Sequence, residues 1–178
     1  MKVEKVEVGF LKENCYVLSI DNKCLIIDPG DEFLKIKDLV GNKKVLGILI
    51  THYHFDHVGA LNDCINFYKC DVIDYNNNAS VIGPFKFEMI KTPGHKEDAI
   101  TYYFKDSNIM FVGDFIFKKS IGRCDLEGGS ILKMKESINL IKKYNDDIIL
   151  YPGHGDFTTL GYEKENNIYL GWFNWRKL

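Results

Sequence analysis

The amino-acid sequence predicts a fold of the α/β (α+β) class, in which helices cover layers of β-sheet. Short apolar or alternating runs of strand length recur along the whole chain, and only a few segments have the spacing of an amphipathic helix. Strands that alternate with a smaller number of helices are typical of sheets covered by helices. The chain has 178 residues, enough to bury a core without disulfide bonds, so we expect one domain over 1–178.

The first part of the chain is dominated by strand patterns. Strands are expected over residues 3–8, 15–20, 24–30 and 45–50. The turn between the first two lies near Gly9 to Asn14, and Pro29 and Gly30 end the third. Helices are expected over 32–40 and from about Val58 to Phe67.

The second part continues the same alternation. Further strands are expected over residues 71–74, 85–91, 100–104, 108–112 and 147–151. A helix near 130–143 has an apolar stripe, and Ser130 is its predicted N-cap. Another helix begins near Gly161. We expect the aromatic tail that follows, with Trp172, Phe173 and Trp175, to dock on the sheet layer; the alternative is a dimer contact.

Composition restricts the partners. The 23 Lys and Arg residues against 25 Asp and Glu give a net charge of −2, which argues against binding to nucleic acid or to an anionic membrane. No apolar run approaches the ~20 residues that span a bilayer, and the N-terminus lacks the apolar region of a signal peptide. The five cysteines contain no C-x-x-C pair and are typical of free thiols in a reducing cytoplasm. We therefore expect a cytoplasmic protein that acts on small molecules or binds proteins.

The five histidines are grouped. His52, His54 and His57 lie within six residues, His95 lies in T-P-G-H, and His154 lies in P-G-H-G. Each group follows an expected strand, at the kind of loop where a rigid scaffold presents functional side chains. A single histidine is usually a surface residue or a satisfied polar group. That explanation would have to hold for all five, so the grouping predicts a metal site.

Carboxylates complete a plausible ligand set. His52 and His54 share one side of an extended segment, and a turn then lets Asp56 point elsewhere. Imidazole together with carboxylate suits Zn, Fe, Mn or Ni. The candidate ligands are His52, His54, Asp56, His57, His95, Asp114 and His154. Seven ligands exceed what one tetrahedral zinc ion takes, so they suit two ions that share a bridging carboxylate.

The pattern H-x-H-x-D-H at 52–57, followed in order by His95, Asp114 and His154, resembles the metallo-β-lactamase superfamily. The resemblance implies a four-layer αβ/βα sandwich with the metals at one edge of the paired sheets. It also implies that His52, His54 and His95 hold the first ion. Asp56, His57 and His154 would hold the second ion, with Asp114 bridging the two.

Within that superfamily the chain resembles the short bacterial forms of glyoxalase II, the hydroxyacylglutathione hydrolases. The similar segments are N-C-Y-V-L at 14–18, I-I-D-P-G at 26–30, G-R-C-D-L-E-G-G-S at 122–130 and T-T-L-G-Y-E-K-E-N-N-I-Y-L at 158–170. The resemblance implies hydrolysis of an S-2-hydroxyacyl thiol ester to a 2-hydroxy acid and a thiol. The nucleophile would be a hydroxide bridging two divalent ions, with Zn preferred over Fe or Mn, and Asp56 would orient it. The short chain after His154 leaves little room for the helical extension that grips glutathione in full-length members.

The sequence is also compatible with other activities of the same fold. A mononuclear iron persulfide dioxygenase would use His52, His95 and Asp114, and a lactone or other ester hydrolase would use the whole ligand set. A non-enzymatic metal or partner binder is disfavoured because no ligand is missing. Lactamases of the common zinc class have a cysteine in place of Asp114, so antibiotic hydrolysis is not expected as the main activity. The oligomeric state, monomer or homodimer, is not predicted.

Several nearby residues have two interpretations. Asp28 is either a turn carboxylate or an acceptor for the outer N–H of a ligating imidazole. Arg123 either pairs with Asp125, which we favour, or meets substrate. Cys124 is interpreted as a small half-buried thiol rather than a ligand or nucleophile. Four aromatic residues are expected in the core: Tyr102, Tyr103, Phe115 and Phe117.

Overall fold

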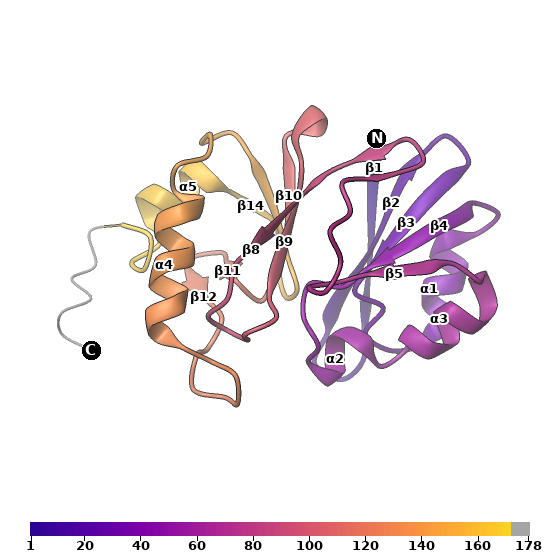
Figure 1. The fold of residues 1–178 in the computed structure, drawn as a ribbon, viewed down its shortest axis with the longest axis horizontal. Helices are drawn as coiled ribbons and strands as arrows, with labels where there is room; N and C mark the ends of the chain where they lie inside the picture. The colour runs from indigo at the N-terminus through magenta and orange to yellow at the C-terminus, as the bar shows by residue number, and fades with distance from the viewer. Residues whose placement is uncertain (172–178) are drawn as a thin grey trace.

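The structure is a computed structural model that describes residues 1–171. Two five-stranded sheets pack face to face, with helices on the outer side of each (Figure 1). The first sheet has the order β1-β2-β3-β4-β5, in which β3, β4 and β5 are parallel and the other neighbours antiparallel. Its strands are β1 (Lys2–Val8), β2 (Glu13–Ile20), β3 (Lys23–Ile27), β4 (Lys44–Leu49) and β5 (Asp71–Ile73).

The second sheet has the order β14-β13-β10-β9-β8, and β10 and β13 are its parallel pair. Its strands are β8 (Glu88–Lys91), β9 (Ile100–Phe104), β10 (Ile109–Gly113), β13 (Ile149–Pro152) and β14 (Thr158–Thr159). Two small hairpins stand apart from the sheets, and they consist of β6 (Val81–Ile82) with β7 (Phe85–Lys86) and β11 (Ile116–Phe117) with β12 (Ser120–Ile121).

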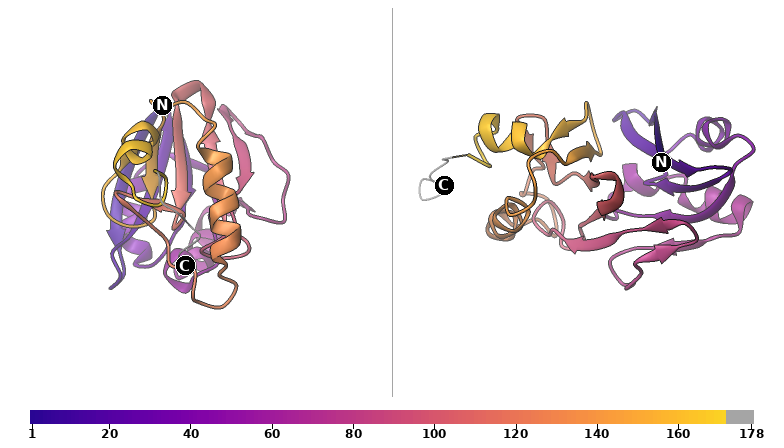
Figure 2. Two further views of the ribbon diagram at one scale, coloured as in Figure 1. Left: turned by 90° about the vertical axis from the view of Figure 1, so that its left-hand side faces the viewer. Right: turned by 90° about the horizontal axis from the view of Figure 1, so that it is seen from above.

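The helices form the two outer layers (Figure 2). α1 (Phe33–Val40) and α3 (Leu61–Tyr68) pack on the first sheet, and α4 (Ile131–Ile141) and α5 (Leu160–Asn166) pack on the second. α2 (Phe55–Val58) is a single turn between β4 and α3, and a 3-10 turn (Lys105–Ser107) joins β9 to β10. The predicted four-layer αβ/βα sandwich is confirmed.

Side-chain alternation explains why the strands appear in the sequence as continuous apolar runs. In β10, Met110 and Val112 belong to the cluster under α4, and Ile109 and Phe111 belong to the cluster between the sheets. A strand buried on both faces has no polar side. The core between the sheets is rich in aromatic rings, and Phe111 lies 5.2 Å from the ring of Tyr16.

The expected helix over 58–67 is wrong in its extent. The chain forms the short α2 first and then begins α3 at Leu61, because the turn after β3 packs directly against α2. A Cβ on Gly30 would lie 1.9 Å from the carbonyl oxygen of Asp56, and the Ala60 N–H donates to the Pro29 oxygen at 3.0 Å instead of within a helix. This contact fixes where α2 lies relative to β3.

Other sequence predictions have mixed outcomes. The expected strand over 85–91 is divided at Phe87, whose N–H donates to Ser80 outside the second sheet. Ser130 is the N-cap of α4, as predicted, and its hydroxyl accepts from the Lys133 N–H. The five cysteines are unpaired, as expected.

Trp172, Phe173 and Trp175 lie outside the described residues. Within residues 1–171, no helix combines the length and apolar character needed to cross a bilayer.

The inter-sheet core should contribute strongly to stability. We expect Phe111→Ala to lower the free energy of unfolding by about 3–5 kcal/mol, because it removes a buried ring and leaves a cavity. Phe157→Ala is the control, since Phe157 is 62% exposed, and should change stability by less than about 0.5 kcal/mol. Urea unfolding of both metal-free variants measures the difference; equal losses would contradict this assignment of the core.

Candidate metal centre

All seven candidate ligands lie at one edge of the paired sheets, in loops or the single helical turn that follow strands. The first four come from the segment after β4: His52 and His54 precede α2, and Asp56 and His57 lie on it. The other three come from the second half of the chain, and they are His95 between β8 and β9, Asp114 directly after β10, and His154 just after β13. The fold therefore brings together side chains from about 100 residues of sequence.

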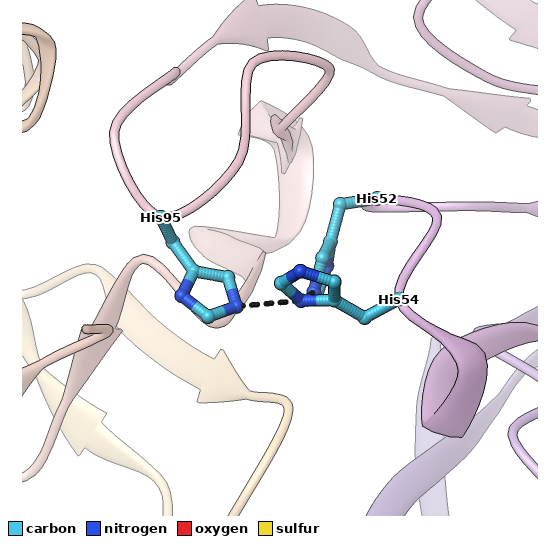
Figure 3. A group of neighbouring side chains, drawn as sticks. All are labelled: His52, His54 and His95. Atoms are coloured by element: carbon cyan, nitrogen blue, oxygen red, sulfur yellow. Dashed lines mark hydrogen bonds between the residues drawn. The ribbon is translucent and has the colours of Figure 1, made fainter. Parts of the chain in front are cut away.

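Three imidazoles form the first group, which consists of His52, His54 and His95. Figure 3 shows their rings converging from two segments of the chain. The Nδ1 atom of His54 lies 3.0 Å from Nε2 of His52 and 2.8 Å from Nε2 of His95. Two nitrogens bound to one tetrahedral ion at 2.0–2.1 Å would be about 3.3 Å apart. The three nitrogens are thus close to the spacing that a single ion requires.

The second group consists of Asp56, His57 and His154. Oδ2 of Asp56 lies 3.2 Å from Nε2 of His154 and 3.9 Å from Nε2 of His57. These atoms all lie within 4.8 Å of one another. One carboxylate with two imidazoles is a donor set that suits a divalent transition metal.

Asp114 lies between the two groups. Its Oδ2 is 3.5 Å from Nε2 of His95 and 3.6 Å from Nε2 of His154, and its Oδ1 is 3.3 Å from Nε2 of His57. Oδ1 of Asp114 and Nε2 of His57 are both buried without a hydrogen bond. Buried polar atoms without partners are rare in folded proteins, and a cation would satisfy both. The residues present therefore fit a two-ion centre in which Asp114 serves both ions.

The outer nitrogens of the imidazoles are held by acceptors. Nδ1 of His95 lies 2.7 Å from the Arg123 carbonyl oxygen, and Nδ1 of His154 lies 3.2 Å from the Leu11 carbonyl oxygen. A carbonyl oxygen accepts hydrogen bonds but cannot donate, so Nδ1 carries the proton in both rings. In the neutral ring, each Nε2 then directs a lone pair towards the centre, the arrangement that ligating histidines usually have.

Asp28 fixes the other side of the centre. Its carboxylate accepts from the Thr51 N–H at 2.7 Å, from the Thr51 hydroxyl at 2.6 Å and from Nδ1 of His57 at 3.0 Å. The Thr51 oxygen lies 3.1 Å from Nδ1 of His52. Asp28 has a φ of 50°, a conformation that aspartate tolerates better than most residues. A single buried carboxylate thus orients one imidazole directly and another through Thr51.

Arg123 contacts the metal centre through its backbone carbonyl group and not through its side chain. Its guanidinium makes two 2.8 Å hydrogen bonds to the carboxylate of Asp125, and both side chains are exposed. Only the Arg123 carbonyl contacts a candidate ligand, at His95. Cys124 is half-buried, and burial with the nearby charge of Asp125 raises the pKa of its thiol. Neither side chain is placed as a metal ligand.

In the metal-free protein, the pKa values of the histidines shift in opposite directions in the two ligand groups. Burial lowers the pKa of His54 to about 4, and burial together with its neighbours' charges lowers the pKa of His52 well below 6.5. Burial also opposes charge on His57 and His154, but there the nearby carboxylates outweigh it and raise both pKa values. The same imidazoles lower the pKa values of Asp56 and Asp114, against the effect of burial.

Sequence reasoning missed two residues at the centre. Glu13 is fully buried at the start of β2, with Oε1 3.8 Å from Nδ1 of His57, and burial raises its pKa well above the ordinary value. Gly153 leaves space for the site, since a Cβ there would lie 2.3 Å from Oδ1 of Asp114. The sequence feature that could have identified Glu13 is an acidic residue at the start of a mostly apolar strand.

The four aromatic residues expected in the core divide into two kinds. Tyr102, Tyr103 and Phe115 are buried as predicted. Phe117 is not: it is only half-buried, and its ring centre lies 6.2 Å from that of His154. It belongs to the β11–β12 hairpin, which stands outside both sheets and borders the metal centre.

Comparisons with known proteins agree with this geometry. Residues 8–75 and 65–154 match the family described as the metallo-beta-lactamase superfamily. The probable metallo-hydrolase YqgX of Bacillus subtilis is 32% identical, covering 98% of this chain and 100% of its own length. The hydroxyacylglutathione hydrolase GloC of Haemophilus influenzae is 30% identical, covering 96% of this chain and 98% of its own.

Two solved structures are similar over almost the whole chain. The B3 metallo-β-lactamase BLEG-1 has a TM-score of 0.91 at 28% identity, covering 95% of this chain and 99% of its own. TTHA1623, crystallised in a di-iron-bound form, has a TM-score of 0.82 at 28% identity, covering 94% of this chain and 100% of its own.

Metal binding by the second group should release protons. The raised pKa values of His57 and His154 mean that, in the metal-free protein, each ring keeps its second proton to a higher pH than an ordinary imidazole does. An ion must displace those protons, so the apparent affinity of the weaker ion should increase as pH rises from 6 to 8. Calorimetric titration with zinc in buffers of different ionisation enthalpy measures this; binding without net proton release would contradict it.

Proposed function

Because the chain belongs to the metallo-β-lactamase superfamily and is a metal-dependent hydrolase, we propose that it is a thioesterase of the glyoxalase II type. The proposed reaction is hydrolysis of an S-2-hydroxyacyl thiol ester to a 2-hydroxy acid and a free thiol. Its relative in Haemophilus influenzae, a hydroxyacylglutathione hydrolase, supports this choice of bond.

One observation carries the proposal: two complete ligand groups share the carboxylate of Asp114 at one edge of the fold. We assign the first group to one ion and the second group to the other. When bound, such ions lower the pKa of a water to about 7 and polarise the carbonyl oxygen of an ester. No serine or cysteine nucleophile is then required.

Asp56 is the proposed catalytic residue. Its side chain is 14% exposed and lines a surface depression, and its Oδ2 lies 3.2 Å from Nε2 of His154. The neighbouring imidazoles keep this carboxylate ionised, which is the state that accepts a proton. In this position Asp56 can orient the attacking water and take up its proton.

The surface around the centre has room for both arms of an ester. A depression of about 310 Å³ adjoins Asp56 on the side of the second group, and its walls include Phe10 and Phe55. A second depression of about 570 Å³ is lined by Gly122, Arg123 and Tyr169 among others, and the Arg123 carbonyl oxygen contacts His95 of the first group. An acyl group and a thiol carrier could each occupy one side, with the thioester carbonyl between them.

We propose zinc as the native metal and a low-molecular-weight thiol as the carrier. The donor set accepts Fe or Mn as well, and the similar structure of TTHA1623 contains two irons. The five unpaired cysteines favour a reducing compartment, so we place the reaction in the cytoplasm.

Asp56→Asn should leave folding intact but strongly reduce turnover. The amide keeps the shape of the side chain and loses the negative charge that binds a metal and accepts a proton. We expect kcat to fall by about 10²- to 10⁴-fold, the usual contribution of a positioned acid or base. Steady-state kinetics on the metal-loaded variant measures this, with circular dichroism to verify folding; an unchanged kcat would refute the role of Asp56.

The proposed activity is tested with thioesters built on several low-molecular-weight thiols, together with metal analysis of the same preparation. We expect about two ions per chain and release of free thiol, with a 2-hydroxyacyl thioester preferred. One iron per chain with O₂ consumption on a persulfide would contradict the proposal and identify a dioxygenase. Hydrolysis of a β-lactam or a lactone in preference to every thioester would contradict it as well.

A further inference from the structure

The loop that carries His154 is held by the opposite half of the molecule. This loop, residues 152–155, follows β13 of the second sheet, and the Gly153 N–H donates to the Gly113 oxygen at 2.9 Å within that half. Its other hydrogen bonds go to the first half of the chain, to β1, β2 and the turn between them. The Asn14 N–H donates to the Gly153 oxygen at 2.7 Å, and the Tyr16 hydroxyl donates to the Pro152 oxygen at 2.6 Å. Glu13 and His154 also pair as an isolated β-bridge.

Asn14 makes the most specific of these contacts. Its side-chain amide donates to the Pro152 oxygen at 3.0 Å and to the Gly155 oxygen at 2.9 Å, so one NH₂ group binds the loop on both sides of His154. The side chain is fully buried, and its Oδ1 makes no hydrogen bond. The orientation of the amide is therefore determined by its two donors.

We propose that Asn14 is a positioning residue for His154, through which the first half of the molecule sets the affinity of the second ion. This inference rests on the assignment of the second group to an ion under the proposed function. Asn14 does not contact the metal centre itself. It holds the backbone on each side of His154, so that Nε2 stays 3.2 Å from Oδ2 of Asp56.

The contacts explain why the effect should be confined to one ion. Without the Asn14 amide, the Gly155 oxygen keeps only a 3.3 Å contact with Lys5, an exposed side chain. The loop that carries His95 is held by other residues, since the Ser137 hydroxyl donates to the Pro93 oxygen and Nδ1 of His95 binds the Arg123 oxygen. A change at Asn14 therefore removes support from the second group and none from the first.

Asn14→Leu is the informative substitution, because leucine has the same branched shape as asparagine, although it is somewhat larger, and has no donor. It also adds no charge that would attract a cation by itself. We expect the variant to bind its first zinc ion like the wild type and its second about 10- to 100-fold more weakly, the usual effect of losing a group that orients a ligand. Titration against a chromophoric chelator measures both affinities without any activity assay.

Two further variants separate positioning from general stability. Tyr16→Phe removes only the hydrogen bond to the Pro152 oxygen, so it should weaken the second ion less than Asn14→Leu; it also keeps the test open if Asn14→Leu does not fold. Ile141→Val lowers stability in the core beneath α4 and should leave both affinities unchanged.

The outcomes distinguish this inference from the proposed function. A wild-type protein that binds a single ion contradicts both. Two ions in the wild type, with an equal second affinity in Asn14→Leu, overturns the role of Asn14 alone. A comparable loss in Ile141→Val also overturns it, since the effect would then follow from stability. Loss of only the second ion, graded from Tyr16→Phe to Asn14→Leu, supports it.

Discussion

The packing of the two sheets against each other is the constraint on which the rest of the structure depends. The candidate ligands come from both halves of the chain, and the distance between His54 and His95 is set by the apolar core between the sheets. Close-packed interiors resist small changes in spacing, so this core holds imidazoles from separate sheets within 2.8 Å of each other. The same packing brings β2 against the loop of His154. The geometry of the second ligand group therefore depends on the sheet packing as well.

Burial of polar groups at this edge is tolerated because they compensate one another. Asp28 accepts three hydrogen bonds, and backbone oxygens of Leu11 and Arg123 hold two imidazoles in one tautomer. Isolated buried charges would be costly, but here carboxylates and imidazoles lie within a few ångströms of each other. The buried atoms that make no hydrogen bond in this region are Nε2 of His57, Oδ1 of Asp114, both carboxylate oxygens of Glu13 and Oδ1 of Asn14. Cations at the centre would satisfy the first two of these atoms.

Much of this architecture is predictable from local sequence, and the exceptions have physical reasons. Runs such as 45–50 and 108–112 identify strands because burial on both faces leaves no polar position, and the histidine spacing identifies the edge where they end. The break between α2 and α3 depends on contact with Gly30, which is distant in sequence. The roles of Glu13, Asn14 and Phe117 likewise arise from packing between halves, and no pattern within one segment contains that information. The grouping of the first three imidazoles and a role for Asp28 as an acceptor were among the sequence predictions. The contacts of the Thr51 hydroxyl and of the Arg123 carbonyl with these rings were not.

Anomalous diffraction from crystals of the zinc-loaded protein is the decisive test of a two-ion centre, because it locates each ion without reference to any substrate. We expect two peaks at the zinc absorption edge, one among His52, His54 and His95 and the other among Asp56, His57 and His154. The carboxylate of Asp114 should contact both. A single peak, or a second one outside these ligands, would contradict the two-ion centre.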